Sequence, residues 1–333
     1  MVWWPTFAIL LANVGRAAPY NTPVQLRQAL AAATLQLEAQ LDAAETSEAR
    51  LHAEVLVFHV LGCDRAYLFA HPERELTEAE QSHYDALISR RAAGEPLQYL
   101  TGHQEFWKAD FLVTPAVLIP RPETEHLIEQ VLALIQQYPL GPRLKFIDVG
   151  TGSGAIAITL ARELPQAEVH AVDLSPAALE VARCNAERLG ARVHFAQSDL
   201  LACFLDVPEN DPSFDFVVSN PPYVGLNEQD KVQEVVKRHE PPMALFAGDD
   251  GLDVIRRLIP QAFQALRPVG WLLMEIGYTQ SEAVMAMLAD WHNVHAVADL
   301  AGIPRVIIAQ RPRPAAQRYS PARKPAEAPE SEA

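Results

Sequence analysis

The sequence is poor in cysteine and contains no pattern typical of a metal site. Cys63, Cys184 and Cys203 are widely separated and form no CxxC pair, and none of the 11 histidines lies in an HExxH or comparable zinc motif. We therefore expect no bound metal. Free cysteine behaves as a small hydrophobic residue and stays reduced in the cytoplasm, so we expect mostly buried thiols and a cytoplasmic protein.

Basic residues are also scarce. The chain has 27 Lys and Arg against 42 Asp and Glu, which gives a formal net charge of -15. Affinity for nucleic acid comes largely from Lys and Arg that contact phosphates, so this balance argues against a protein that mainly coats DNA or RNA, although it leaves room for a local basic patch. With 49% hydrophobic residues over 333 positions, the chain has enough apolar material for a large core and for two domains.

Neither end of the chain has the pattern of a folded element or a membrane anchor. Residues 1–22 contain an apolar run followed by small residues, but they lack a basic n-region and the run is too short to cross a membrane. We interpret them as a disordered or over-long N-terminal extension, with a targeting signal as the alternative. Residues 311–333 are rich in Pro, Ala and charge, which predicts a disordered tail.

Apolar residues recur at helical spacing across residues 23–95. Three helices are predicted: one opened by Thr22 and a proline, one from Ser47 to Gly62, and one capped by Thr77. This small helical domain carries no catalytic constellation. We interpret it as a substrate-docking domain, with a purely structural role as the alternative.

The pattern changes after this domain. In residues 96–122 the hydrophobic period shifts towards two and prolines interrupt it, which predicts a connecting segment with a β-hairpin. Residues 123–310 alternate apolar strands with helices, the pattern of an α/β fold with a mostly parallel sheet covered on both faces. The last two strand segments, 294–300 and 305–310, have no helix between them, so we expect them to pair as an antiparallel hairpin at the sheet edge.

Three glycines separate a buried strand from a helix in FIDVGTGSGAIAI. Gly150 permits a tight turn, Gly152 lets the backbone approach a ligand, and Gly154 lets the helix pack close to the sheet. Asp173 ends the next strand about 20 residues beyond Gly154, the offset at which a carboxylate meets a ribose hydroxyl. Together the loop and the acid describe an adenosine-containing ligand, although alone they also fit the NAD fingerprint.

A second acidic residue narrows the choice of ligand. Asp199 ends the third strand, so it should share the carboxyl edge of the sheet with the glycine loop and Asp173. A ribose carboxylate followed by an acid or amide beside the adenine is the arrangement of a methionine-sulfonium cofactor site. The alternative role for Asp199 is to cap the short helix that follows it.

The stretch SNPPYV, residues 219–224, must end the fourth strand, because proline cannot donate to a sheet ladder and disfavours helix in the residue before it. Asn220 should therefore lie at a rigid strand end, where α/β sheets bind ligands. The tetrapeptide resembles the NPPY of methyltransferases that act on planar sp2 nitrogens. This resemblance implies that the Asn220 side-chain oxygen and the Pro221 carbonyl accept the two N–H bonds of a flat amino or amide group, while Pro222 stiffens the backbone and Tyr223 stacks on the substrate. A simple proline turn is the alternative.

An NPPY tetrapeptide after the fourth strand of a GxGxG fold resembles that of methyltransferases acting on planar sp2 nitrogens, either in bases or in glutamine side chains. Further stretches closely resemble the bacterial and organellar family of protein glutamine methyltransferases that modify peptide-chain release factors. These stretches are EPLQYLTG, LIPRPETE, HEPPMALFAGDDGL and LLMEIGYTQ. The resemblance runs from about Pro23 to Gln310.

The resemblance implies a class I, Rossmann-like methyltransferase that uses S-adenosylmethionine to methylate the side-chain amide nitrogen of the glutamine in the Gly-Gly-Gln (GGQ) loop of class 1 release factors. We expect a monomer with no direct nucleic-acid or membrane partner. The catalytic residues implied are Asn220, Pro221 and Tyr223, joined in substrate binding by Pro222. The implied cofactor site comprises Gly150, Thr151, Gly152, Ser153, Gly154, Asp173, Asp199, Leu200 and Asn220.

Several neighbours of the site also match the family. Leu200 stands where relatives often carry an aromatic residue against the adenine, and it covers the same apolar face with weaker stacking. Arg121 and Glu123 are expected to have structural roles, with a substrate contact as the alternative, and Glu240 and Pro241 to wall the pocket.

Two other functions remain as alternatives. A DNA or RNA amino-methyltransferase would need a surface that grips phosphates and usually a separate recognition domain, and neither is evident in the sequence. An NAD-dependent oxidoreductase would explain the glycines and Asp173 but leaves NPPY unexplained.

Overall fold

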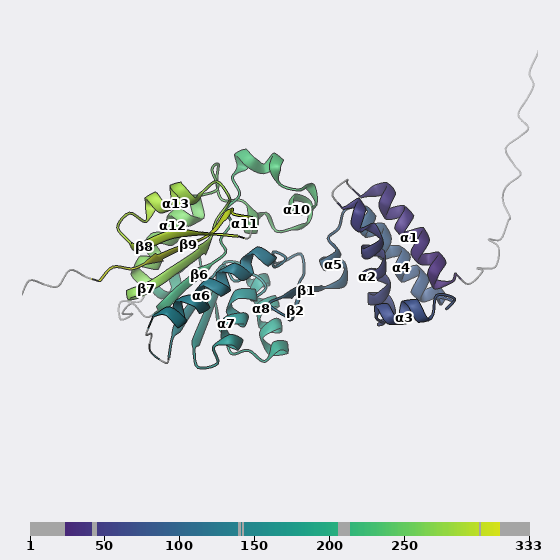
Figure 1. Cartoon of the computed structure of the whole chain (residues 1–333), viewed down its shortest axis with the longest axis horizontal. Helices are drawn as coiled ribbons and strands as arrows, with labels where there is room; N and C mark the ends of the chain where they lie inside the picture. The colour runs from purple at the N-terminus through teal and green to yellow at the C-terminus, as the bar shows by residue number, and fades with distance from the viewer. Residues whose placement is uncertain are drawn as a thin grey trace, which may run out of the picture. The chain divides into compact units, whose positions relative to one another are not determined.

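The computed structural model describes residues 24–41, 45–138, 141, 143–205, 214–299 and 301–313. By its internal contacts, the chain divides between Gly102 and His103 into a helical unit and an α/β unit (Figure 1). Three sequence predictions lie outside the described residues: the N-terminal extension, the cap at Thr22, and residues 314–333 of the tail.

The helical unit is built around an apolar core of its own. Leu26 and Leu37 on the first long helix are fully buried, as is Leu56 on the second, and Leu87 of the fourth joins them. The helical elements in the described part of this unit are α1 (Leu26–Gln40), η1 (Thr46–Glu48), α2 (Ala49–Leu61), α3 (Arg65–Ala70), α4 (Glu78–Ala92) and α5 (Leu97–Thr101).

Local capping explains where these helices begin and end. The Thr77 side chain accepts a hydrogen bond from the Glu80 N–H at 3.2 Å, and the Glu80 carboxylate accepts one from the Thr77 N–H at 2.9 Å. This capping box confirms the start predicted for α4. The predicted start at Ser47 falls instead within η1, and α2 ends as predicted at Gly62, which has a φ of 60°.

The boundary of the helical unit differs from the sequence interpretation, which ended it at residue 95 and assigned 96–122 to a separate connecting segment. Residues 97–101 form α5, which contacts α2 and α4. The predicted hairpin belongs to the α/β unit, where β1 (His103–Phe106) pairs antiparallel with β2 (Ala109–Leu112). Trp107 and Lys108 join these strands at φ values of 49° and 58°, as a two-residue type I′ turn requires.

The α/β unit contains a seven-stranded sheet with the strand order β5-β4-β3-β6-β7-β9-β8. Its neighbouring strands are parallel except at β9, which pairs antiparallel with both β7 and β8. The predicted mostly parallel sheet with an antiparallel hairpin at one edge is confirmed, with β9 inside the edge strand β8. The strands are β3 (Lys145–Val149), β4 (Glu168–Asp173), β5 (His194–Gln197), β6 (Phe214–Ser219), β7 (Leu266–Glu275), β8 (His292–Ala298) and β9 (Pro304–Gln310).

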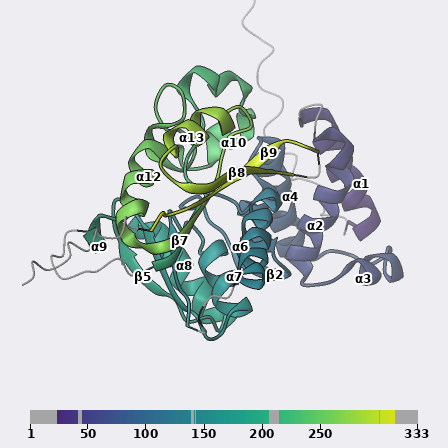
Figure 2. The ribbon, with the colours of Figure 1, turned by 60° about the vertical axis from the view of Figure 1, so that its left-hand side comes forward.

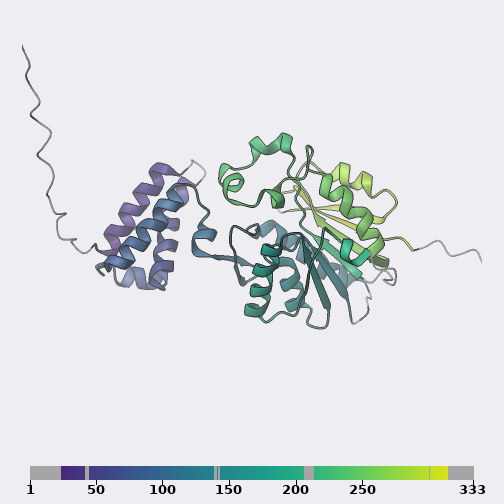
Figure 3. The same ribbon diagram turned by 180° about the vertical axis from the view of Figure 1, so that it is seen from behind.

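Alternate residues of the strands face two different hydrophobic cores. Phe146 of β3 packs with helices α6, α7 and α8, whereas its neighbour Ile147 packs with α12 and α13. Figures 2 and 3 show the sheet between these two helical layers. The helices are α6 (Glu125–Gln137), α7 (Ala155–Glu163), α8 (Pro176–Leu189), α12 (Asp253–Ala265) and α13 (Ser281–Met287).

Shorter elements occupy the loops at one end of the sheet. Between β6 and α12 the chain leaves the sheet and forms a protrusion that contains α10 (Figures 1 and 3). These shorter elements are η2 (Pro122–Thr124), α9 (Ala202–Leu205), η3 (Leu226–Lys231), α10 (Glu234–His239) and α11 (Pro242–Leu245). In the described parts of the chain, no helix combines the length and the apolar character that crossing a membrane requires.

The register of the central strands brings the expected ligand-binding segments together. Val149 at the end of β3 pairs with Val172 of β4 on one side and with Ser219 of β6 on the other. The glycine loop that follows Val149 therefore leaves the sheet between Asp173 and Asn220. Because both faces of the sheet are covered by helices, this carboxyl edge is where a ligand can reach the strand ends.

The expectation that the cysteines are mostly buried is wrong. Cys184 and Cys203 are exposed, Cys63 is half-buried, and all three are free thiols. On α8 the buried positions include Ala182 and Ala186, which lie on the face opposite to Cys184. The face of the helix decides the burial of this cysteine, because its own hydrophobicity is too small to do so.

Candidate active site

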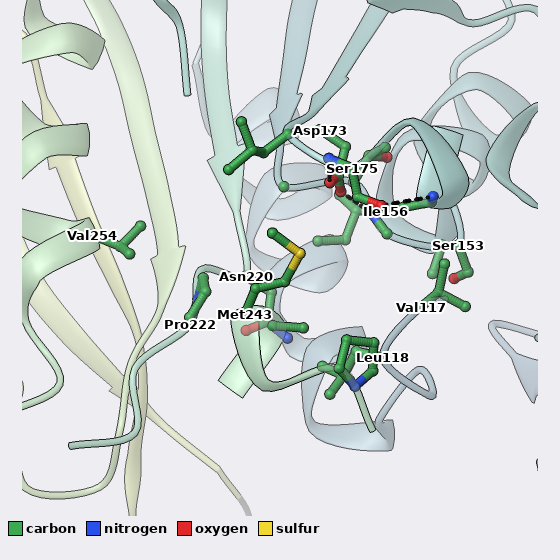
Figure 4. A pocket seen from close by; sticks show the side chains of 18 of the residues that line it. Val117, Leu118, Ser153, Ile156, Asp173, Ser175, Asn220, Pro222, Met243 and Val254 are labelled. Carbon is green, nitrogen blue, oxygen red and sulfur yellow. Dashed lines mark hydrogen bonds between the residues drawn. The ribbon is translucent and has the colours of Figure 1, made fainter. Parts of the chain in front are cut away.

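A cavity of about 220 Å³ lies at the carboxyl edge of the sheet, within the α/β unit. Residues from each of the segments predicted to bind ligand line it, including Gly152, Asp173, Leu200, Asn220 and Pro222. In Figure 4, Asp173 and Ser175 lie at one end of the view, Leu118 lies at the other, and Asn220 lies between them.

The glycine loop forms the wall of the cavity next to α7. Gly150, Gly152 and Gly154 all have left-handed backbones, with φ values of 76°, 55° and 84°. A Cβ at Gly150 or Gly152 would stand in open space, so the bare backbone of the loop is accessible to a ligand. A Cβ at Gly154 would lie 3.3 Å from the Cβ of Ala182, so this glycine allows α7 to lie close to α8. The sequence predicts a close approach towards the sheet instead.

Asp173 is fixed by two backbone donors. Its Oδ2 accepts a hydrogen bond from the Gly152 N–H at 2.8 Å, and its Oδ1 accepts one from the Ser175 N–H at 2.9 Å. A carboxylate has about four acceptor positions, so it keeps free lone pairs for a ligand hydroxyl. The accessible loop backbone and this pre-oriented acid fit the ribose and the adjoining part of an adenosine-containing cofactor.

The loop also rests on two buried side chains that sequence reasoning missed. Asp148 accepts hydrogen bonds from the Thr151 hydroxyl at 2.6 Å and from the Ala157 N–H at 3.2 Å. Burial raises the pKa of this carboxyl to about 7, against the opposing effect of those two bonds. Asn185 of α8 donates to the Ser153 carbonyl at 3.0 Å. A polar residue at the end of an apolar strand was the available signal for Asp148.

Asp199 does not cap the helix that follows it. The Ser198 hydroxyl accepts the hydrogen bond from the Cys203 N–H, at 3.1 Å, while the Asp199 carboxylate forms an ion pair of 2.6 Å with Arg257 of α12. All of Asp199, Leu200 and Arg257 line the cavity. Leu200 has a φ of 53°, a strained conformation for a residue with a side chain, and such strain concentrates at functional sites.

The tetrapeptide begins where the sequence predicts, directly after β6 ends at Ser219. Asn220 and Pro222 belong to the described lining of the cavity, but Pro221 and Tyr223 do not. Pro221 is buried, and the Tyr223 hydroxyl donates a hydrogen bond of 3.1 Å to Glu275. Burial, together with the charge of Glu275, raises the pKa of Tyr223.

Two further residues hold Asn220 and Tyr223, and neither was identified from the sequence. Asn220 Nδ2 donates to the Thr124 hydroxyl at 2.9 Å, and Thr124 donates to Glu275 at 2.7 Å. Thr124 and Glu275 are buried, and burial raises the pKa of Glu275. The signal for Glu275 was a carboxylate at the end of the otherwise apolar strand LLMEI, because charged residues are rarely buried without a partner.

Two proline-containing segments, residues 120–123 (PRPE) and 239–242 (HEPP), meet beside the cavity. Arg121 forms an ion pair with the buried Glu240, which also accepts a hydrogen bond from the Ile119 N–H at 3.3 Å. Arg121 and Pro241 line the cavity, whereas Glu123 is exposed. The Arg121–Glu240 pair ties together two segments that are far apart in the sequence.

The α/β unit has a mostly parallel seven-stranded sheet with one antiparallel strand, β9, and a cavity at the carboxyl end of β3. These features define the class of a methyltransferase. In agreement, residues 140–310 match the family model described as methyltransferase domain. Residues 28–102 match a second model, described as PrmC N-terminal domain.

Curated relatives define the family within this class. The chain is 56% identical over 272 residues to the release factor glutamine methyltransferase of Koribacter versatilis, covering 82% of this chain and 95% of the relative. Proteins of the same name from Moorella thermoacetica (44% identity, 86% of this chain and 98% of the relative) and Geobacter sulfurreducens (41%, 78% and 88%) are also similar. The chain belongs to the family of release factor glutamine methyltransferases, as the resemblance in its sequence predicted.

Proposed function

We propose that the chain transfers a methyl group from S-adenosylmethionine to the side-chain amide nitrogen of the glutamine in the GGQ loop of class 1 release factors. The observation that carries this proposal is that one cavity is lined both by the glycine loop with Asp173 and by Asn220. Under this proposal, the site for an adenosine-containing donor and the holder for a flat amide share one cavity. Membership in the release factor glutamine methyltransferase family supports this substrate.

The cofactor end of the site follows from the contacts of the loop. We assign the backbone of Gly150, Thr151, Gly152, Ser153 and Gly154 to the cofactor. The free lone pairs of Asp173 would accept the ribose hydroxyls, Asp199 would face the adenine edge, and Leu200 would cover the adenine face. When bound, S-adenosylmethionine supplies the electrophilic methyl carbon.

The amide nitrogen of the substrate is a poor nucleophile, because its lone pair is delocalised. The substrate end of the site must therefore orient it. We assign the Asn220 side-chain oxygen and the Pro221 carbonyl as acceptors for its two N–H bonds, which turns the lone pair towards the methyl carbon. Pro222 would hold that backbone rigid, and the Tyr223 ring would stack on the amide. Positioning can supply about 7–11 kcal/mol of a barrier, whereas a general base typically contributes about 10²–10⁴-fold in rate, so no strong base is required.

We propose that residues 23–95 dock the release factor, that the protein acts as a monomer in the cytoplasm, and that it needs no nucleic acid or membrane. The formal charge of -15 supports the exclusion of nucleic acid as the main partner. The free thiols agree with a reducing compartment.

The test is methyl transfer from labelled S-adenosylmethionine. The full chain is incubated with a class 1 release factor, with the same factor carrying Ala in place of the GGQ glutamine, and with DNA and RNA in separate reactions. We expect label on the unmodified factor alone. Label on the Ala-containing factor would exclude the proposed acceptor, and label on nucleic acid would favour the amino-methyltransferase alternative.

A further inference from the structure

Two hydrogen bonds connect the amide of Asn220 to the buried carboxylate of Glu275, which accepts a third hydrogen bond from Tyr223. Asn220 Nδ2 donates to Thr124 Oγ1 at 2.9 Å, and Thr124 Oγ1 donates to Glu275 Oε2 at 2.7 Å. The Tyr223 hydroxyl donates to the other carboxylate oxygen at 3.1 Å. Thr124 lies at the end of η2 and Glu275 at the end of β7, so a side chain of the cavity is tied to two distant segments of the chain.

The chemistry of these groups fixes the direction of each bond. An ionised carboxylate can only accept hydrogen bonds, so Glu275 takes the single O–H of Thr124. The Thr124 oxygen then has only lone pairs left, and it can hold the NH2 end of Asn220 but not its oxygen. Because the amide is planar, its oxygen Oδ1 is turned away from Thr124. A flipped Asn220 would set two acceptors against each other without a proton between them.

This orientation matters for the proposed reaction, on which the inference rests. The NH2 group of a glutamine side chain offers two donors and needs acceptors, which Asn220 Oδ1 provides and a flipped Asn220 would not. We propose that Glu275, acting through Thr124, is a positioning residue that keeps the Asn220 oxygen available to the substrate nitrogen. Its own carboxylate does not need to touch the substrate.

The arrangement depends on the charge of Glu275. Burial raises the pKa of this carboxyl and Glu123 raises it further, whereas the hydroxyls of Thr124 and Tyr223 and the Arg305 guanidinium lower it. A protonated carboxyl can donate at one oxygen and thereby reverse the Thr124 hydroxyl. The turnover number should therefore fall as the pH drops through this raised pKa.

The first experiment compares Thr124→Val with Thr124→Ser in the full chain. Valine has nearly the shape of threonine but removes the hydroxyl, whereas serine keeps it. With a release factor as substrate, we expect kcat to fall about tenfold to a hundredfold in Thr124→Val, because orientation at a reacting centre has effects of that order, and to recover in Thr124→Ser. The affinity for S-adenosylmethionine should stay at its original value in both variants.

The second experiment replaces Glu275 by Gln, which keeps the shape but introduces a donor. We expect a lower kcat at every pH and loss of the acidic limb of the wild-type profile. Hydrogen exchange of the Asn220 side-chain NH2 in 15N-labelled protein gives an independent measure. This exchange should be slow in the wild type and in Thr124→Ser, and fast in Thr124→Val and Glu275→Gln.

The two measurements separate this inference from the proposed function. If the wild type methylates no release factor but the amide exchange follows the expected order, the substrate assignment fails and the control of Asn220 by Glu275 stands. Equal losses of kcat in Thr124→Val and Thr124→Ser would overturn the inference, because packing and not the hydroxyl would then be responsible. Slow exchange in Glu275→Gln would overturn it as well.

Discussion

The backbone N–H of Gly152 donates a hydrogen bond to the Asp173 carboxylate at 2.8 Å, which joins the glycine loop to the end of the neighbouring strand. Asp173 thus has two roles, because it both orders the loop and would accept the ribose hydroxyls. We expect Asp173→Ala to raise the Kd for S-adenosylmethionine about tenfold to a hundredfold, since loss of a hydrogen-bond partner in a buried site has an effect of about 1–3 kcal/mol. Isothermal titration calorimetry measures this change.

Asn220→Ala should show the opposite pattern. The side chain of Asn220 is held by Thr124 and is assigned to the substrate amide, so its removal should reduce methyl transfer by at least about tenfold and leave the Kd for S-adenosylmethionine nearly unchanged. The same titration, combined with single-turnover methylation, separates the two variants. Equal loss of cofactor affinity in both would contradict the division of the cavity into a cofactor end and a substrate end.

Asp199→Ala should weaken the cofactor less than Asp173→Ala does. Asp199 is exposed and already paired with Arg257 at 2.6 Å, so its interaction with a ligand is screened by solvent and shared with that guanidinium. We expect a rise in Kd of roughly twofold to fivefold, given that exposed charges typically contribute about 1 kcal/mol or less. A larger effect than that of Asp173→Ala would reverse the ranking of the two acids.

Gly152→Ala and Gly154→Ala form a matched pair of substitutions in one loop. Both glycines have left-handed backbones, which disfavour alanine by about 1–2 kcal/mol. The methyl group at Gly154 would also come within 2.7 Å of Ile158 Cδ1, so Gly154→Ala should lower the melting temperature more. Gly152→Ala should weaken S-adenosylmethionine binding more, because its methyl group would stand in open space at the cavity. Thermal unfolding with and without cofactor measures both effects.

The pH dependence of stability should reveal Asp148. Its pKa is raised to about 7 from an ordinary value of 3.8, so the folded state holds the proton more tightly than the unfolded chain. This contribution to stability is complete below about pH 3.8 and is lost as the pH rises through about 7. Between pH 5 and pH 8 the free energy of unfolding should fall by about 3 kcal/mol more in the wild type than in Asp148→Asn. Urea unfolding measures this free energy at each pH. If it changed by the same amount with pH in both proteins, this role of Asp148 would be excluded.

Local sequence signals were sufficient to predict those residues of the site that stand directly after a strand. The glycines, Asp173 and Asn220 stand directly after apolar strands, and parallel strands bring such positions to one edge of a sheet. The fold class followed from the same alternation of strands and helices.

Contacts between distant segments could not be predicted in this way. Thr124 and Glu275 are 151 positions apart, and no local pattern indicates that they share a hydrogen bond. Asp199 pairs with Arg257, which belongs to α12 and lies 58 positions further along the chain. The sequence likewise gave no means to place Cys184 on the solvent side of α8, because a single small residue does not determine how a helix is turned.

The position of β9 has a consequence for biosynthesis. Among the described strands it is the last to be made, yet it lies between β7 and β8, and Ile307 and Ile308 are buried on its two faces. A nascent chain therefore cannot complete its sheet until residue 310 has left the ribosomal exit tunnel. Until that moment the β9-facing edge of β7 stays unpaired, and unpaired strand edges in partly folded chains are sites of chaperone binding and aggregation.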